Sequence, residues 1–186
     1  MAPYEHVVVV MSIVLGLAVT QLLKGAAQLY RKRASVQAYW LHWAWVVLLV
    51  FFSLVFWWTF WNYRDIAEWD FFRFVVYLSP SIALFFLTAI AFPDPSEPAA
   101  DMKAYYFSIR AGFFGTFALL GVLAGLTASV VRGLPVLDPS NLFRLALVVL
   151  SLIVMRSASE RVHAAVWALS AGLLVVFIVL FQFRLG

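Results

Sequence analysis

Six long apolar blocks, separated by short polar connections, constrain this chain more than any other feature. A helix that crosses the ~30 Å hydrocarbon layer of a bilayer needs about 20 residues, so blocks of this length are typical of membrane-spanning helices. The sequence therefore predicts an all-α, polytopic membrane protein, folded as a six-transmembrane-helix bundle with short loops in a single integral membrane domain (residues 1–186). The blocks cover residues 7–30, 39–61, 71–92, 105–131, 139–159 and 162–183.

The composition indicates that lipid is the main solvent of this chain. Apolar residues make up 65% of it and charged residues only 12%, whereas a soluble domain carries about 25% charged residues. A soluble fold of this size leaves too much surface exposed to hide so much hydrocarbon. The chain has no cysteine, which excludes disulfides, thiol chemistry and metal sites built on cysteine.

The fifth block, residues 139–159, is the weakest, because its continuous apolar part covers only residues 142–155. Such a length is compatible with a re-entrant segment. Asp138 followed by Pro139 instead predicts a capped helix start with proline in its first turn. Arg144 and Arg156 are then expected to reach opposite interfaces by extending their side chains. We interpret the block as a span and keep the re-entrant segment as the alternative.

Basic residues predict the orientation. The N-terminal tail offers Glu5 and His6, whereas the first connection carries Arg31, Lys32 and Arg33. Positive charge favours the cytoplasmic side, so the N-terminus is expected outside and, after six spans, the C-terminus as well. We expect a multi-pass protein of the cell membrane, in a bacterial inner membrane. The net charge of +4 then indicates contacts with anionic lipid headgroups of the lipid bilayer, and no nucleic-acid partner.

Six of the eight tryptophans lie in the second block, three near each end. Indole rings favour the membrane interface, because the ring is apolar while its N–H needs a partner. This pattern predicts two aromatic belts about one membrane thickness apart.

The third block contains Pro80 at mid-depth, between Ser79 and Ser81. Proline removes one backbone hydrogen bond and predicts a kink, and the freed carbonyl needs a partner in lipid. Ser79 or Ser81 is expected to supply it. The kink is either a gate or a packing device.

A proline-rich stretch, residues 93–98, divides the chain into three spans and three. A local similarity between residues 16–25 and 125–133 is compatible with a duplication. Because each half has an odd number of spans, the two halves would form an inverted repeat, as in some transporters.

A ridge of polar and small residues follows the first block at intervals of four: Ser12, Gly16, Thr20, Lys24 and Gln28. Polar groups avoid lipid by facing the bundle, and small residues allow helices to approach closely. The ridge therefore predicts the buried face of this helix.

Lys24 is the most unusual member of that ridge, because a charge at its depth is costly in lipid. It is a candidate for lining a pore or a site for an anion or a lipid headgroup. The alternative is that its flexible side chain reaches the interface. The candidate set for the pore or ligand site is Lys24, Gln21, Gln28, Thr20 and Arg110.

A second small-residue ridge, Gly121, Gly125 and Ser129, lies in the fourth block. Such ridges bring membrane helices together. We expect this ridge to form a subunit contact in a homo-oligomer, most simply a two-fold dimer.

Arg156, Glu160 and His163 lie at the turn between the fifth and sixth blocks, at helical spacings of four and three. They are candidates for a pH-responsive gate, because histidine titrates near neutral pH. A solvated, ion-paired turn is the alternative.

Enzyme motifs are absent. The sequence has neither a Gly-x-Ser-x-Gly turn nor a His-Glu-x-x-His motif, and its three histidines predict no metal site. Haem held by His42 and His163 is an alternative, because both would lie on one side. The expected function is a small channel or transporter for an ion or small solute, without a cofactor. The alternatives are a non-catalytic scaffold or partner-binding subunit and, further off, a haem-binding or lipid-modifying protein.

Overall fold

The computed structural model describes residues 3–94 and 101–183, so residues 95–98 of the proline-rich stretch lie outside the described residues. The described chain is helical, as predicted, and six of its helices are long and apolar enough to cross a membrane. The helices are α1 (Pro3–Arg31), α2 (Trp40–Trp58) with a 3₁₀ turn (Thr59–Tyr63), α3 (Phe71–Ile90), α4 (Met102–Arg132), α5 (Pro139–Arg156) and α6 (Glu160–Phe177) with a π-helical turn (Ile178–Gln182).

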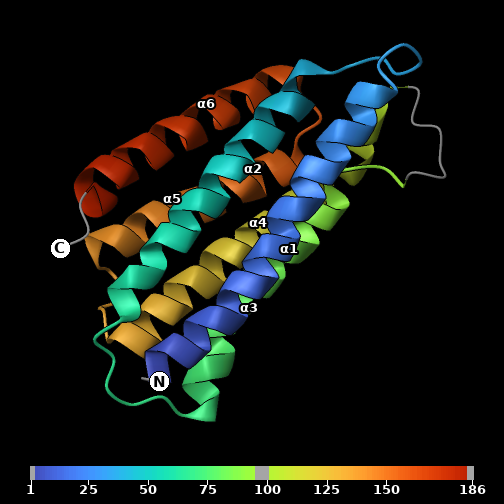
Figure 1. Cartoon of the computed structure of the whole chain (residues 1–186). Helices are drawn as coiled ribbons and strands as arrows, with labels where there is room; N and C mark the ends of the chain where they lie inside the picture. Colours follow the sequence, from blue (N-terminus) through green and yellow to red (C-terminus); the bar gives the residue numbers. More distant parts are fainter. Residues whose placement is uncertain (1–2, 95–100, 184–186) are drawn as a thin grey trace.

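The fifth block is a continuous helix of 18 residues, roughly 27 Å long. It begins where the sequence predicts. Asp138 caps it by accepting hydrogen bonds from the hydroxyl and the backbone N–H of Ser140, at 2.6 and 2.9 Å. These bonds hold the pKa of the Asp138 carboxyl below its usual value. Helix α5 is continuous and lies beside α4 and α6 (Figure 1), which favours a span over the re-entrant segment.

Four helices form a row in the order α1, α3, α4 and α5, with extensive packing between each neighbouring pair. Helix α6 lies against α5, and α2 lies in front of the row, where it contacts α1 and α6 (Figure 1). The core between them is made of large apolar side chains. Leu22, Leu49, Leu87 and Phe114 are fully buried in it.

Contacts at the two ends of the bundle define the connectivity. At one end, Tyr4 Oη donates to the carbonyl of Phe60, and Trp58 Nε1 donates to the carbonyl of Gln182, both at 2.9 Å. The start of α1 and the end of the α6 segment therefore both lie beside the end of α2. At the opposite end, Gln37 and Asp101 form a short backbone bridge. The six helices thus cross the bundle alternately.

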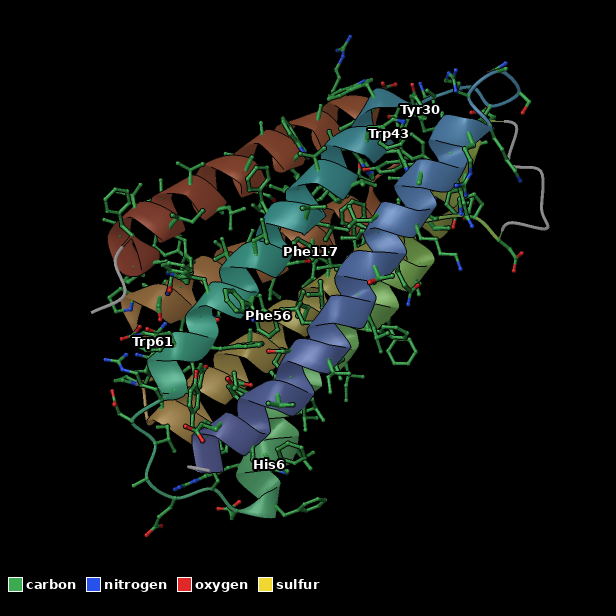
Figure 2. All side chains as sticks on the ribbon, in the orientation of Figure 1. His6, Tyr30, Trp43, Phe56, Trp61 and Phe117 are labelled. Carbon is green, nitrogen blue, oxygen red and sulfur yellow. The ribbon has the colours of Figure 1, made fainter. Side chains whose placement is uncertain are left out.

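The aromatic belts agree with this arrangement. In Figure 2, Trp43 and Trp61 lie at opposite ends of α2, and Tyr30 lies near Trp43. Both tryptophans contribute to the two clusters that the sequence indicates.

Helix α1 contradicts one prediction. Its buried face is apolar and includes Met11, Leu15 and Leu22, whereas Gly16, Thr20 and Lys24 of the expected ridge are exposed, and Ser12 and Gln28 are half-buried. The Thr20 hydroxyl donates to the carbonyl of Gly16, at 2.7 Å. Because this hydroxyl is satisfied within its own helix, it does not need the interior of the bundle. The apolar face packs better against α3.

The second ridge also has a different role from the expected one. A Cβ atom on Gly121 would lie 2.7 Å from Cγ2 of Val148 in α5. Further along, Asn141 Nδ2 lies 3.5 Å from the Ser129 hydroxyl, and a Cβ on Gly125 would lie 3.9 Å from Asn141 Oδ1. Helix α5 of the same chain therefore packs against this ridge, whereas the subunit contact expected there stays a prediction.

Pro80 leaves the carbonyl of Val76 without its usual helical partner, and two hydroxyls replace it. Ser79 Oγ lies 2.8 Å from this carbonyl and Thr127 Oγ1 of α4 lies 3.0 Å from it. Ser79 thus has the role that the sequence predicts. Ser81 instead turns to the sulfur of Met11, at 3.7 Å. The proline is accommodated within the packing of α3 against α4 and α1.

Candidate functional site: a cavity at the centre of the bundle

A cavity of about 120 Å³ lies between α2 and the row of helices behind it. All six helices contribute to its wall. Most of the lining is aromatic or aliphatic, with Phe56 of α2 and Phe117 of α4 lying near the middle of the bundle in Figure 2. Phe56 and Phe177 are only half-buried, so the wall is incomplete near α2 and α6. The sequence gives no sign of this cavity, because it arises where six separate helices meet.

Arg144 brings a positive charge to the wall of this cavity. Its Nη1 donates to Asn141 Oδ1 at 2.8 Å and to Ser140 Oγ at 3.1 Å. The guanidinium carbon lies 5.7 Å from the centre of the Phe177 ring. Within residues 3–94 and 101–183 it forms no ion pair. The sequence analysis assigned Arg144 to the interface, whereas the structure turns it toward neutral partners beside the cavity.

Tyr77 brings an unused hydroxyl to the same wall. Its side chain is only 1% exposed, and its Oη has no hydrogen-bond partner among the described residues. The ring is held by aromatic neighbours, 4.7 Å from the Tyr63 ring and 5.1 Å from the Trp69 ring between centroids. A rigid buried hydroxyl of this kind is available to an acceptor placed in the cavity.

The two threonine hydroxyls of the wall are satisfied by backbone carbonyls. Thr59 Oγ1 donates to the carbonyl of Phe56, at 2.7 Å. Thr127 Oγ1 lies within hydrogen-bonding distance of the carbonyls of Val76 and Leu123. Arg144, Tyr77 and Tyr63, which also lines the cavity, therefore supply the polar groups most available to a ligand.

The candidate residues predicted from sequence do not line this cavity. Thr20 and Lys24 are exposed on α1, while Gln21 and Gln28 are half-buried. On α4, Arg110 donates through Nη1 to the carbonyl of Phe107, at 2.6 Å. These five side chains thus do not share the central cavity with Arg144 and Tyr77.

The three candidate gate residues do not interact with one another in one cluster. Glu160 forms an ion pair with Lys103, at 2.5 Å, whereas Arg156 is exposed and makes no ion pair within the described residues. His163 is fully buried. Its Nε2 lies 3.0 Å from the Ser157 carbonyl and its Nδ1 lies 2.7 Å from the Tyr106 hydroxyl.

These hydrogen bonds define which ring nitrogen of His163 carries the proton. A carbonyl only accepts, so Nε2 carries the proton, and Nδ1 then accepts from Tyr106. Because both nitrogens of the neutral ring are engaged, His163 is poorly placed to bind a haem iron. His42 is also buried, and its Nε2 has no partner in the described part of the chain. In that same part, no three histidine or acidic residues group as metal ligands do.

Tyr39 interacts with both charged groups of this ion pair. The Lys103 ammonium lies 5.6 Å from the centre of the Tyr39 ring. Burial raises the pKa of the Tyr39 hydroxyl to about 12, with a smaller contribution from the nearby Glu160 carboxylate. This end of the bundle is therefore a packed structural contact between α4, α6 and the start of α2.

No known family, curated protein or solved structure matches this chain. The function is therefore inferred from the cavity and the polar side chains in its wall.

Proposed function

We propose that this protein is a membrane transporter that binds a small, largely apolar organic solute in the central cavity. The observation that carries this proposal is a cavity of about 120 Å³ in the middle of six helices able to cross a membrane. Binding sites of small molecules are mostly apolar hollows with a few placed polar groups. The wall around Arg144 and Tyr77 has this character.

A carrier fits this site better than an ion channel. A channel needs a wetted path whose lining replaces the water around an ion. The wall here is mainly phenylalanine and leucine side chains, which offer no such groups. The looser packing of α2, compared with the row of helices behind it, supplies the element whose movement would admit and release the solute.

The test fills the cavity and measures transport. Proteoliposomes holding the full chain should take up at least one of three radiolabelled probes of similar size: benzenesulfonate, benzamide or benzyltrimethylammonium. Ala124 lines the cavity, so Ala124→Phe should abolish the uptake. Ala111→Phe, at an exposed position of the same helix, should leave it unchanged.

Two results would overturn the transporter. Uptake of all three probes equal to that of empty liposomes would remove the proposed activity. Equal uptake by Ala124→Phe and the unchanged chain would show that the solute does not pass through the cavity.

A second candidate function is a subunit that associates through α1, in a homo-oligomer or with another membrane protein. The exposed ridge favours it, because a Cβ on Gly16 would meet no atom within 4 Å and Thr20 and Lys24 beside it are also exposed. Since the chain has no cysteine, Thr20→Cys provides a single crosslinking site. A disulfide-linked dimer formed in native membranes would support self-association, and its absence would count against a symmetric contact at this ridge.

We also propose an orientation in a bacterial inner membrane. The end of the bundle with the α1–α2 and α5–α6 connections carries Arg31, Lys32, Arg33, Arg156 and Arg161. By the preference of basic residues for the cytoplasmic side, this end would face the cytoplasm and both termini would lie outside.

A further inference from the structure

Arg144 lies inside a membrane-spanning helix and forms no ion pair within residues 3–94 and 101–183. It lies five residues after Pro139, the first residue of α5, which is roughly 8 Å along the helix axis. Asp138 attracts this charge from a distance but forms no ion pair with it, because its Oδ1 accepts from the Ser140 hydroxyl, which lies 3.1 Å from Arg144 Nη1. A charge at this depth is costly and commonly marks a substrate path. An anionic ligand would supply the missing negative charge.

The unused part of the guanidinium has the geometry to bind an acid group. Nη1 makes both hydrogen bonds, to Ser140 and Asn141, and neither Nε nor Nη2 bonds to a described residue. The Nε–Nη2 edge presents two parallel N–H groups, which match the two oxygens of a carboxylate or sulfonate. Ser140 and Asn141 therefore hold the side chain in place while this edge stays available.

The Tyr77 hydroxyl is a second, independent indication of a ligand. It is buried without a partner and belongs to the same wall as Arg144. Its O–H can donate to an oxygen atom, so it complements an acid group. Buried polar groups that stay unpaired are uncommon and call for an explanation.

The rest of the wall defines the body of the ligand. No acidic side chain is among the described residues that line the cavity, and Phe56, Phe117 and Phe177 supply aromatic surface. The volume of about 120 Å³ is close to that of an engineered cavity of ~150 Å³ that binds benzene. A ring or short chain fits, whereas the two acyl chains of a phospholipid do not.

We infer that the transported solute is a small organic anion, with its acid group on Arg144 and Tyr77 and its apolar body against the phenylalanine side chains. This inference rests on the proposed transport function and names its substrate class. The positive charge of Arg144 excludes cations that the aromatic rings would otherwise attract.

Equilibrium binding to the purified full chain in detergent tests this selectivity. Benzenesulfonate should bind roughly tenfold or more tightly than benzamide, because the guanidinium forms an ion pair only with the anion. Arg144→Gln should remove this difference by weakening benzenesulfonate alone, with benzamide unchanged. Tyr77→Phe should weaken benzenesulfonate by severalfold.

Matched controls separate recognition from general loss of structure. Arg161→Gln and Tyr30→Phe alter exposed side chains at the far end of the bundle and should leave both affinities unchanged. Unchanged benzamide binding by Arg144→Gln also reports that the cavity is intact. If Arg144→Gln fails to fold, Arg144→Lys keeps the charge but lacks the planar edge, and it should show a reduced preference for the anion.

Each remaining outcome has a distinct meaning. Equal affinities for benzenesulfonate and benzamide, or a preference for benzyltrimethylammonium, would overturn the anion and leave the transporter standing. An anion preference that survives both Arg144→Gln and Tyr77→Phe would place the acid group elsewhere and overturn the assignment. Competition by phosphatidylglycerol micelles would assign the guanidinium to a lipid headgroup instead of a solute. Binding of none of the probes would remove the proposed function itself.

Discussion

The hydroxyl of Tyr106 donates a hydrogen bond to Nδ1 of His163 across 2.7 Å and ties α4 to α6. The same imidazole donates from Nε2 to the Ser157 carbonyl, in the connection that follows α5. Phe107 and Phe114 enclose the ring, with centroids 5.0 and 5.5 Å away. One neutral histidine thus joins three helices at the end of the bundle opposite to the termini.

Removing the tyrosine hydroxyl should destabilise this junction. In Tyr106→Phe, Nδ1 of His163 loses its donor inside an aromatic enclosure, and an unpaired buried acceptor costs about 1–3 kcal/mol. We expect a lower thermal unfolding midpoint in detergent, with Tyr30→Phe at an exposed position as the control. An unchanged midpoint in Tyr106→Phe would mean that the hydrogen bond adds nothing to stability.

Gly25 should tolerate no larger residue, because a Cβ there would overlap the ring of Phe92 at the end of α3. We expect Gly25→Ala to destabilise the chain by about 1–3 kcal/mol through overpacking. Gly16→Ala is the matched control on the same helix, with no atom within 4 Å of the new methyl group. Adding Phe92→Ala should recover part of the loss. Equal stability of the two glycine variants would contradict the close approach of α1 and α3.

Gly121→Leu should lower the stability of the folded protomer and should not act by dissociating an oligomer. Since Val148 of α5 lies where the new side chain would go, we expect a loss of about 1–3 kcal/mol of stability from the strained contact of α4 and α5. Val148→Ala in the same chain should restore part of it. The unfolding midpoint and, by native mass spectrometry, the oligomeric state would be measured on the same samples. A dissociated oligomer with an unchanged unfolding midpoint would return this ridge to a subunit interface.

Cysteine labelling should reveal the orientation directly, because the chain has no native cysteine. In intact bacterial cells, a membrane-impermeant maleimide should label Asp65→Cys and Val136→Cys, both at exposed positions of the end where α1 begins. Ser35→Cys and Ala158→Cys should react only after the membrane is permeabilised. The reverse pattern would invert the proposed orientation and leave the fold unchanged.

Much of the fold follows from local sequence signals. The lengths of the apolar blocks predict the six helices, and Asp138 with Pro139 predicts where the least apolar one begins. The hydrogen bonds that replace the one lost at Pro80 were predictable only in part. Ser79 is adjacent in sequence, whereas Thr127 reaches the Val76 carbonyl from another helix.

The prediction of the buried face of α1 was wrong, because polar residues do not need to face the bundle when their hydrogen bonds are made within their own helix. Thr20 bonds to its own helix, and Lys24 is long enough to extend toward the interface. The site was missed for a related reason. Arg144 lies near the end of an apolar block, where a basic residue normally marks the interface, and nothing in the order of residues places Tyr77 in the same cavity wall.

The order of packing has a consequence for biogenesis. The main neighbour of α1 is α3, and the intervening α2 contacts the row much less. During synthesis α1 and α2 enter the bilayer before α3, which covers the apolar face of α1, has been made. The early contact between α1 and α2 is therefore rearranged when α3 arrives. The interior wall supplied by α5 and α6 arrives last. The cavity is therefore completed only once α6 has been synthesised, and chains truncated before α6 would insert without ever acquiring it.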